Sequence, residues 1–193
     1  MADDLPLLTV ADAAEWSHWL TEHGGRAGGV WLVLAKKGTT KPTRLTYEHA
    51  LEEALCHGWV DGQLSRGEAG TFRRKFTPRR PGSSWSQRNV TLVNRLVNEG
   101  RMQPAGLAAV DRAKAEGSWD AAYASQANIE VPADLREALE AHPGAAAMFA
   151  RLSGANRYAI LYRVTTAKRA ETRRRRIEQF VAMLARGETV HPQ

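Results

Sequence analysis

Two adjacent arginines lie in a loop between a predicted strand and a predicted helix, where their chemistry favours anion binding. The stretch Phe76–Ser86 carries Arg79 and Arg80 through a proline-containing loop to the start of that helix. Free backbone N–H groups at a helix N-terminus, the helix dipole and guanidinium groups all attract negative charge. We therefore expect a phosphate or carboxylate group to bind here. A structural role is the alternative, because prolines around a turn also stiffen a chain and paired arginines also form salt bridges.

Ring and polar side chains close to this loop extend the predicted ligand site. Trp59 and Trp85 offer flat apolar surface on which a base or another ring can stack. Asp61 precedes a glycine that permits close approach, so it can orient a ligand hydroxyl or act as a general base, and an ion pair with Lys75 is its structural alternative. The predicted ligand-binding residues are Trp59, Asp61, Gln63, Arg74, Arg79, Arg80, Trp85, Ser86 and Asn89.

The thiol and imidazole that precede this segment do not form a catalytic pair. Cys56 and His57 are neighbours on a predicted helix, where successive side chains diverge by about 100°. A helix C-terminus also disfavours a thiolate. His49 and Glu53 are four residues apart, but no HExxH or paired CxxC pattern accompanies them. We predict no metal site and no cofactor.

Positive charge is concentrated in two segments of this chain, whose formal net charge is +6. Residues 72–101 hold eight basic side chains against one acidic side chain, and residues 163–176 hold seven against one. Such asymmetry favours an anionic partner, although a solvated basic face is the alternative. The second segment starts the last predicted helix, where the dipole would prefer negative charge. Nucleic-acid binding is therefore an alternative function, with Arg73, Lys75, Arg173, Arg174 and Arg176 as the candidate contacts.

Periodicity and capping residues predict a mixed N-terminal half. We expect a helix over Val10–Glu22, a buried strand over Val30–Lys36 and a helix over Tyr47–His57 that Thr46 caps. His49, Glu52, Glu53 and Cys56 fall on the outer face of the second helix. A hairpin then follows, with strands Trp59–Ser65 and Thr71–Thr77.

The turn of the hairpin sets its predicted register. If the register is symmetric about residues 66–70, Val60 pairs with Phe76 and Leu64 with Phe72 on the core face. Asp61 then lies opposite Lys75 on the other face, and Arg74 falls on the core face opposite Gly62. Arg74 either reaches past this glycine towards an anion or indicates a different register. The outer face would present Trp59, Asp61, Gln63, Arg73, Lys75 and Thr77.

The second half of the chain is predicted to be helical. Helices are expected over Ser86–Glu99 and Pro104–Glu116, followed by a linker over Ser118–Val131. Four more helices are expected over Pro132–Ala141, Ala145–Leu152, Ser153–Thr165 and Ala170–Arg186. The sequence therefore predicts an α+β fold. Its domain at residues 1–125 has a small, mainly antiparallel sheet of about three strands with flanking helices, and residues 126–193 form an all-helical module.

Several motifs resemble the YdeI/OmpD-associated bacterial family. Residues 47–62 read YEHALEEALCHGWVDG, residues 73–89 contain FTPRRP and WSQRN, and residues 100–123 continue the likeness. The helical module adds PADLREAL, RYAILYRV and AKRAETRRRRI, so the similarity covers nearly the whole chain. It implies a connection with bacteriocin or cationic-peptide protection and with an outer-membrane porin as an envelope partner. It supplies no catalytic residues.

The sequence also predicts where the protein is located and what it binds. Met1–Thr9 do not resemble a secretory signal, no apolar run reaches the roughly 20 residues of a membrane span, and Cys56 is the only cysteine. We therefore expect a cytoplasmic protein without a transmembrane segment. The preferred function is binding of a small anionic or ring-bearing ligand between the hairpin and the Ser86 helix. Nucleic-acid binding is one alternative, and an enzyme with Asp61 as acid or base is another.

Overall fold

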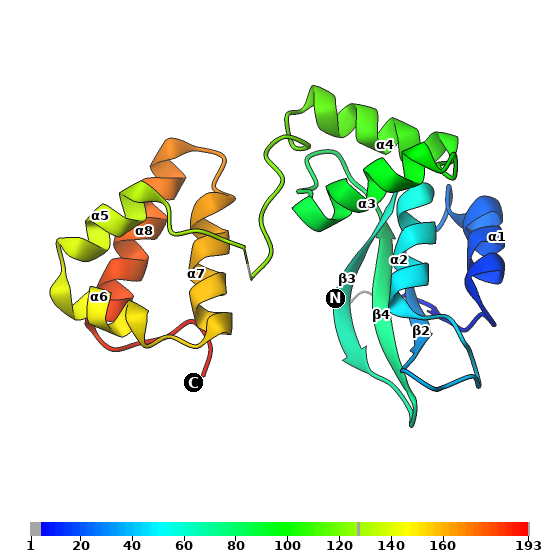
Figure 1. The fold of residues 1–193 in the computed structure, drawn as a ribbon, viewed down its shortest axis with the longest axis horizontal. Helices are drawn as coiled ribbons and strands as arrows, with labels where there is room; N and C mark the ends of the chain where they lie inside the picture. The colour runs from blue at the N-terminus through cyan, green and yellow to red at the C-terminus, as the bar shows by residue number, and fades with distance from the viewer. Residues whose placement is uncertain (1–4, 127, 193) are drawn as a thin grey trace. The chain divides into compact units, whose positions relative to one another are not determined.

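The chain forms two compact units in the computed structural model, which describes residues 5–126 and 128–192 (Figure 1). The units span Met1–Ala122 and Tyr123–Gln193. The first holds a sheet with helices on it, and the second is helical throughout. The chain therefore has the predicted α+β architecture, and each unit is described by itself below.

A four-stranded sheet in the order β1-β2-β4-β3 forms the centre of the first unit. Strand β2 (Val30–Ala35) is antiparallel to β4 (Thr71–Pro78), which is antiparallel to β3 (Trp59–Arg66). Strand β2 is buried at five of its six residues, as its β-branched and aromatic content predicts. Strand β1 (Leu7–Leu8) pairs in parallel with β2 and was not predicted, because two residues carry no periodicity.

Helices α1 (Ala13–His23) and α2 (Tyr47–Cys56) pack against one face of this sheet. The side chain of Asp12 accepts hydrogen bonds from the first turn of α1, and Thr46 caps α2 as predicted. Apolar side chains of both helices meet those of the strands in the first core. Its buried members are Val10, Trp16, Leu20, Val30, Leu32, Leu34, Leu45, Ala50, Ala54, Trp59 and Phe76.

The opposite side of α2 forms a second core with α3 (Gln87–Asn98) and α4 (Pro104–Ala115). Cys56 is 1% exposed in this core, so its predicted place on the outer face of α2 is wrong. On α3, Leu96 is buried in this core, whereas its neighbour Val97 is 44% exposed. The core contains Leu51, Leu55, Cys56, Trp85, Val93, Leu96, Val110 and Ala113.

The register of the β3–β4 hairpin differs from the predicted symmetric one. Asp61 pairs with Phe76 and Leu64 pairs with Arg74, so Gly62 and Gln63 together oppose the single residue Lys75. This is a β-bulge, which inserts one extra residue into one strand and changes the side to which the strand points. Trp59 and Asp61 consequently lie on the face that α1 and α2 cover, and the predicted pairing of Asp61 with Lys75 is wrong.

The second unit packs four helices around one core. These are α5 (Ala133–Glu140), α6 (Pro143–Ala150), α7 (Gly154–Thr165) and α8 (Ala170–Ala185). Ser153 caps α7 by accepting a hydrogen bond from the backbone of Asn156. An apolar stripe of α8 faces this core, where Ile177, Val181 and Leu184 are buried and Phe180 is partly buried. Among residues 5–126 and 128–192, no helix is both long and apolar enough to span a bilayer.

Candidate functional site

The arginine loop is a packed part of the second core. Arg79 is only 7% exposed, its guanidinium lies 3.5 Å from the ring centroid of Trp85, and it donates a hydrogen bond to the carbonyl of Ser84. The space bounded by Arg79, Arg80 and the end of α4 is about 10 Å³, which is about the room of one water molecule. Ser86 uses its hydroxyl to cap α3. Arg79 and Ser86 therefore have structural roles in this loop, and anion binding here stays a prediction.

The two tryptophans of the predicted site are buried in different cores. Trp59 is 2% exposed, packs edge-on against Trp16 and Trp19, and donates its indole N–H to the carbonyl of Gly24. Trp85 is 3% exposed and packs against Trp119. Neither ring offers a face to a ligand. Asn89 is likewise buried, so all three residues contribute to packing.

Asp61 and Arg74 come together in a polar cluster at the boundary between the sheet and α2. The Tyr47 hydroxyl donates a 2.9 Å hydrogen bond to Oδ2 of Asp61, and Nε of Arg74 donates one of 3.1 Å to the same oxygen. Nη2 of Arg74 donates a third. The guanidinium groups of Arg74 and Arg88 lie 4.7 and 5.3 Å from the ring centroid of Tyr47. The cluster joins α2, both hairpin strands and the first turn of α3.

The electrostatics of this cluster make Asp61 an oriented hydrogen-bond acceptor. Burial, followed by the nearby charge of Asp61, raises the pKa of Tyr47 to about 12, so its hydroxyl stays protonated and donates. The Asp61 side chain is 13% exposed. Among the residues that the structure describes, none donates a hydrogen bond to Oδ1. Oδ2 of Asp61 is thus held in place, while Oδ1 remains able to accept a hydrogen bond.

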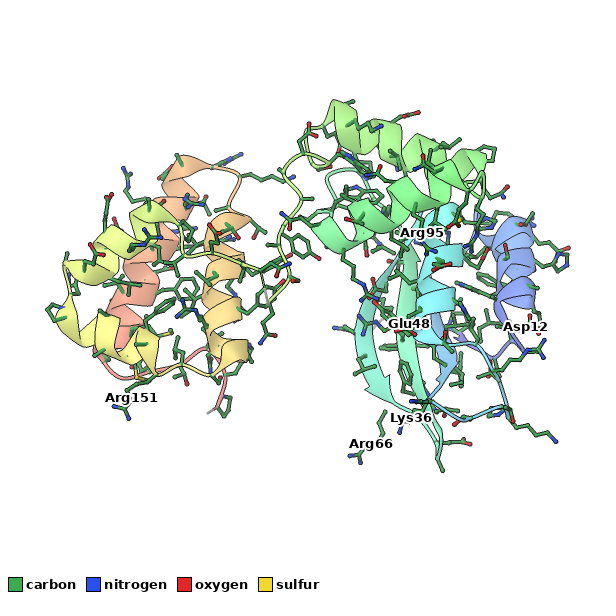
Figure 2. The ribbon with its side chains drawn as sticks, in the orientation of Figure 1. Asp12, Lys36, Glu48, Arg66, Arg95 and Arg151 are labelled. Carbon is green, nitrogen blue, oxygen red and sulfur yellow. The ribbon has the colours of Figure 1, made fainter. Side chains whose placement is uncertain are left out.

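An open groove beside the β3–β4 turn provides apolar surface between two cations. Its volume is about 480 Å³, and its lining residues are Lys36, Leu64, Ser65, Arg66, Gly67, Thr71 and Phe72. Leu64 is 63% exposed, whereas Phe72 is partly buried against the first core. The labelled side chains of Lys36 and Arg66 lie at the end of the sheet that carries this turn (Figure 2). A backbone hydrogen bond from Lys36 to Gly70 joins the end of β2 to the turn.

The groove and the polar cluster lie on the same face of the hairpin. The pairs Asp61–Phe76, Leu64–Arg74 and Arg66–Phe72 form successive rows, because β4 residues two apart point to the same face. Asp61 therefore lies in the first row and Arg66 in the third, and the hairpin side chains that line the groove come from the second and third rows. Gln63 is exposed in the bulge between the first two rows. Leu64 and Arg66 were missed because the assumed register placed Leu64 in the core. The one sequence signal was Gly62 inside the strand, since such a glycine often marks a bulge, but it does not fix the register.

A serine and a histidine meet away from this surface. Oγ of Ser17 lies 3.3 Å from Nε2 of His57, and burial lowers the pKa of His57 and so favours its neutral form. A nucleophilic pair also needs a third group to orient the base. Among the described residues no hydrogen bond reaches Nδ1 of His57, and the nearest acid on its helix, Glu53, pairs with Arg101. The pair therefore fastens α1 to the end of α2.

The arginine run of α8 is partly used inside the second unit. Arg173 donates two hydrogen bonds to the carboxylate of Asp134 and one to the carbonyl of Val164. Arg176 donates to the carbonyl of Arg163. Both carbonyls belong to the last turn of α7, where the helix dipole attracts cations. The contacts of Arg173 and Arg176 with the end of α7 therefore offset the unfavourable positive charge at the start of α8. Arg174 and Arg175 remain exposed.

Metal binding has no support among residues 5–126 and 128–192, in which no group of three His, Cys, Asp or Glu side chains is placed to hold an ion.

The fold and the site together define an α+β protein of two compact units, with a cation-flanked groove on its sheet. The chain belongs to the family described as a domain of unknown function (DUF8412), which matches residues 8–109.

The second unit matches a different family. Residues 128–187 match the family described as "Bacteriocin-protection, YdeI or OmpD-Associated". The predicted resemblance is thus confirmed for the helical unit, but it does not extend over nearly the whole chain. The motifs at residues 47–62 and 73–89 lie within the match to the first family. No curated protein and no solved structure gave a significant match to this chain.

Proposed function

We propose that the protein binds a small organic anion with an apolar or ring-bearing body in the groove beside the β3–β4 turn. One observation carries this proposal: the exposed Leu64 and the partly buried Phe72 form apolar surface between the cations Lys36 and Arg66. A volume of about 480 Å³ lies within the usual range of ligand pockets.

Two physical contributions support binding at this place. Covering Leu64 and Phe72 removes apolar surface from water, which contributes about 25 cal/mol for each Å² buried. Lys36 and Arg66 would select a negatively charged head group and fix its orientation. Both cations are exposed, so salt will weaken their contribution.

Titration with anilinonaphthalene sulfonate, an anion with a ring body, tests this proposal by fluorescence. We expect saturable binding that Leu64→Ser or the double change Lys36→Ala with Arg66→Ala weakens about tenfold. The matched controls are Leu107→Ser, an exposed apolar residue on α4, and Lys37→Ala, the exposed neighbour of Lys36. Equal affinity in the wild type and in the groove variants, with circular dichroism unchanged, would refute the groove as the site.

Nucleic-acid binding is a second candidate that the exposure of Arg174 and Arg175 favours. Arg173 and Arg176 contribute less, because they contact Asp134 and the end of α7. Single-stranded and duplex oligonucleotides would then bind with an affinity that falls steeply with salt, because bound phosphates release counterions. Affinity that does not change after the double substitution Arg174→Ala with Arg175→Ala would rule out this surface.

The family description of the second unit supports a role in protection against bacteriocins. We propose this role together with a cytoplasmic location, for which the support is the single, buried Cys56. Deletion of the gene should increase sensitivity to bacteriocins, and fractionation should recover the protein with cytoplasmic markers. Unchanged sensitivity would count against the protective role, and recovery with envelope markers would count against the location.

A further inference from the structure

We infer that the ligand of the groove is an elongated organic acid with a neutral O–H or N–H donor far from its anionic group. This inference rests on the proposed function and names the class of molecule that the site would bind. It comes from the order of side chains along the hairpin, where the carboxylate of Asp61, the apolar Leu64 and the cation Arg66 follow one another on one face.

The register fixes the spacing of these three groups. Asp61 pairs with Phe76, Leu64 with Arg74 and Arg66 with Phe72, so each row lies two β4 residues from the next. Two residues of a strand span about 7 Å, which places the first and third rows about 14 Å apart. A ligand that meets both ends must therefore be extended, and its middle must be apolar where it crosses Leu64.

The hydrogen-bond donor of the ligand is inferred from the contacts that hold the Asp61 carboxylate. Tyr47 and Arg74 direct three hydrogen bonds to Oδ2 and so fix the plane of the carboxylate. Oδ1 receives none from the described residues, and the side chain keeps 13% of its surface exposed. A carboxylate oxygen fixed in this way is preorganised to accept one further hydrogen bond.

The charge around Asp61 favours a neutral donor over an ammonium group. The guanidinium of Arg74 is bonded to the carboxylate, and that of Arg88 lies on the same tyrosine ring. The local charge is therefore one negative and two positive groups, which would repel a cation. A hydroxyl or an amide N–H avoids this repulsion and still supplies the hydrogen bond.

A series of linear acids measures both the length and the donor. Competition against anilinonaphthalene sulfonate would compare ω-hydroxydodecanoate, whose extended chain separates its two ends by a similar distance, with dodecanoate. We expect the hydroxylated acid to bind about tenfold more tightly, because a hydrogen bond to a charged group has about this effect on affinity. The shorter ω-hydroxyhexanoate should gain nothing over hexanoate, since it cannot reach Asp61 from Arg66. ω-Aminododecanoate should bind more weakly than the hydroxylated acid.

Variants then assign the donor contact to Asp61. Asp61→Asn should reduce the preference for the hydroxylated acid while dodecanoate still binds through Lys36 and Arg66, and Asp111→Asn, an exposed acid on α4, is the control. Because Asp61→Asn also weakens the contact with Arg74, the ligand series on the wild-type protein stands as an independent measurement. If dodecanoate binds in the groove but the hydroxyl adds nothing, this inference is wrong and the proposed function stands. If neither acid nor the fluorescent anion binds, the proposed function fails as well.

Discussion

Arg74 occupies a position where a charged side chain needs a partner. It lies between Phe72 and Phe76 on β4 and faces α2, with only 25% of its side chain exposed. A half-buried guanidinium is costly unless it is paired, and Asp61 supplies the opposite charge from the neighbouring strand. Tyr47 closes the arrangement with its hydroxyl and its ring. These three residues need one another before any ligand is present.

The raised pKa of Tyr47 leads to the first prediction. Burial and the adjacent Asp61 favour the neutral phenol in the folded state, so its contribution to stability is complete below pH 10. That contribution is lost as the pH rises from 10 to about 12. Absorbance titration of the folded protein should therefore show a tyrosine that ionises near pH 12, and Tyr47→Phe should remove this component. If Tyr47→Phe only reduces the amplitude of the transition near pH 10 and removes no component near pH 12, the result would contradict the hydrogen-bonded cluster.

The sequence singled out part of this site although the register that it assumed was wrong. Asp61 was selected as an acid beside a glycine and Arg74 as a cation on the core face, and the structure places them in contact. Trp59 was selected for its ring, but the same ring is what the first core buries. Composition alone cannot separate a ring that stacks on a ligand from a ring that fills a core. That distinction depends on which face of the strand the residue occupies.

At the scale of elements, the bulge in β3 determines which residues of this strand face the helices. One extra residue in a strand exchanges its inward and outward positions, because side chains alternate with a period of two. A symmetric turn predicts the approximate ends of the hairpin but not this insertion, since Gly62 and Gln63 carry no apolar pattern. The helices were more predictable, because Thr46 caps α2 as expected and α7 starts next to Ser153, where its helix was expected to begin. Cap chemistry is local in sequence, whereas strand register depends on contacts between distant residues.

The contact between α4 and the end of α2 yields the second prediction. A Cβ atom on Gly106 would lie 2.1 Å from the carbonyl oxygen of Cys56, so the helices approach closely only because this residue is glycine. Gly106→Ala should lower the free energy of unfolding by about 2–3 kcal/mol, as overpacking does elsewhere. Gly144→Ala in α6 meets no atom within 4 Å and should be neutral or slightly stabilising. Urea denaturation of both variants measures the difference, and equal effects would refute the close contact.

A charge network that joins the same elements yields the third prediction. Arg101 follows α3 and donates to Glu52 and Glu53 of α2, and Arg95 also pairs with Glu52. Burial alone would raise the pKa of Glu52, but the hydrogen bonds from Arg101 and Arg95 outweigh it and lower the pKa below 4.5. The resulting stability is present above pH 4.5 and is lost as the pH falls through the lowered pKa.

Arg101→Ala should therefore reduce the free energy of unfolding by about 1–2 kcal/mol at neutral pH, a range typical of hydrogen bonds to charged groups at a partly exposed site. The difference from the wild type should shrink below pH 4.5, where Glu52 becomes protonated. Arg26→Ala, an exposed arginine outside this network, should cost almost nothing. Denaturation at neutral and acidic pH checks this result, and a loss that is independent of pH would mean that Arg101 acts through packing.

At the scale of the whole molecule, two units with separate cores coincide with two separate family matches. The match at residues 8–109 lies within the first unit, and the match at residues 128–187 lies within the second. Each unit has its own hydrophobic core, and the basic start of α8 is offset by contacts inside the second unit. This correspondence suggests that each unit carries the information for its own fold.

The final prediction follows from that separation. Fragments 1–122 and 123–193, expressed separately, should each fold, because the buried members of each core lie within one fragment. Circular dichroism should show helical spectra for both, and each should unfold cooperatively in urea. The smaller fragment has only about 70 residues and should be the less stable of the two, since small domains bury less of their surface.

Anilinonaphthalene sulfonate should bind fragment 1–122 with the affinity of the full chain, because all groove residues belong to it. Loss of binding in a folded fragment 1–122 would show that the groove depends on the second unit, and failure of either fragment to fold would show that the units stabilise each other.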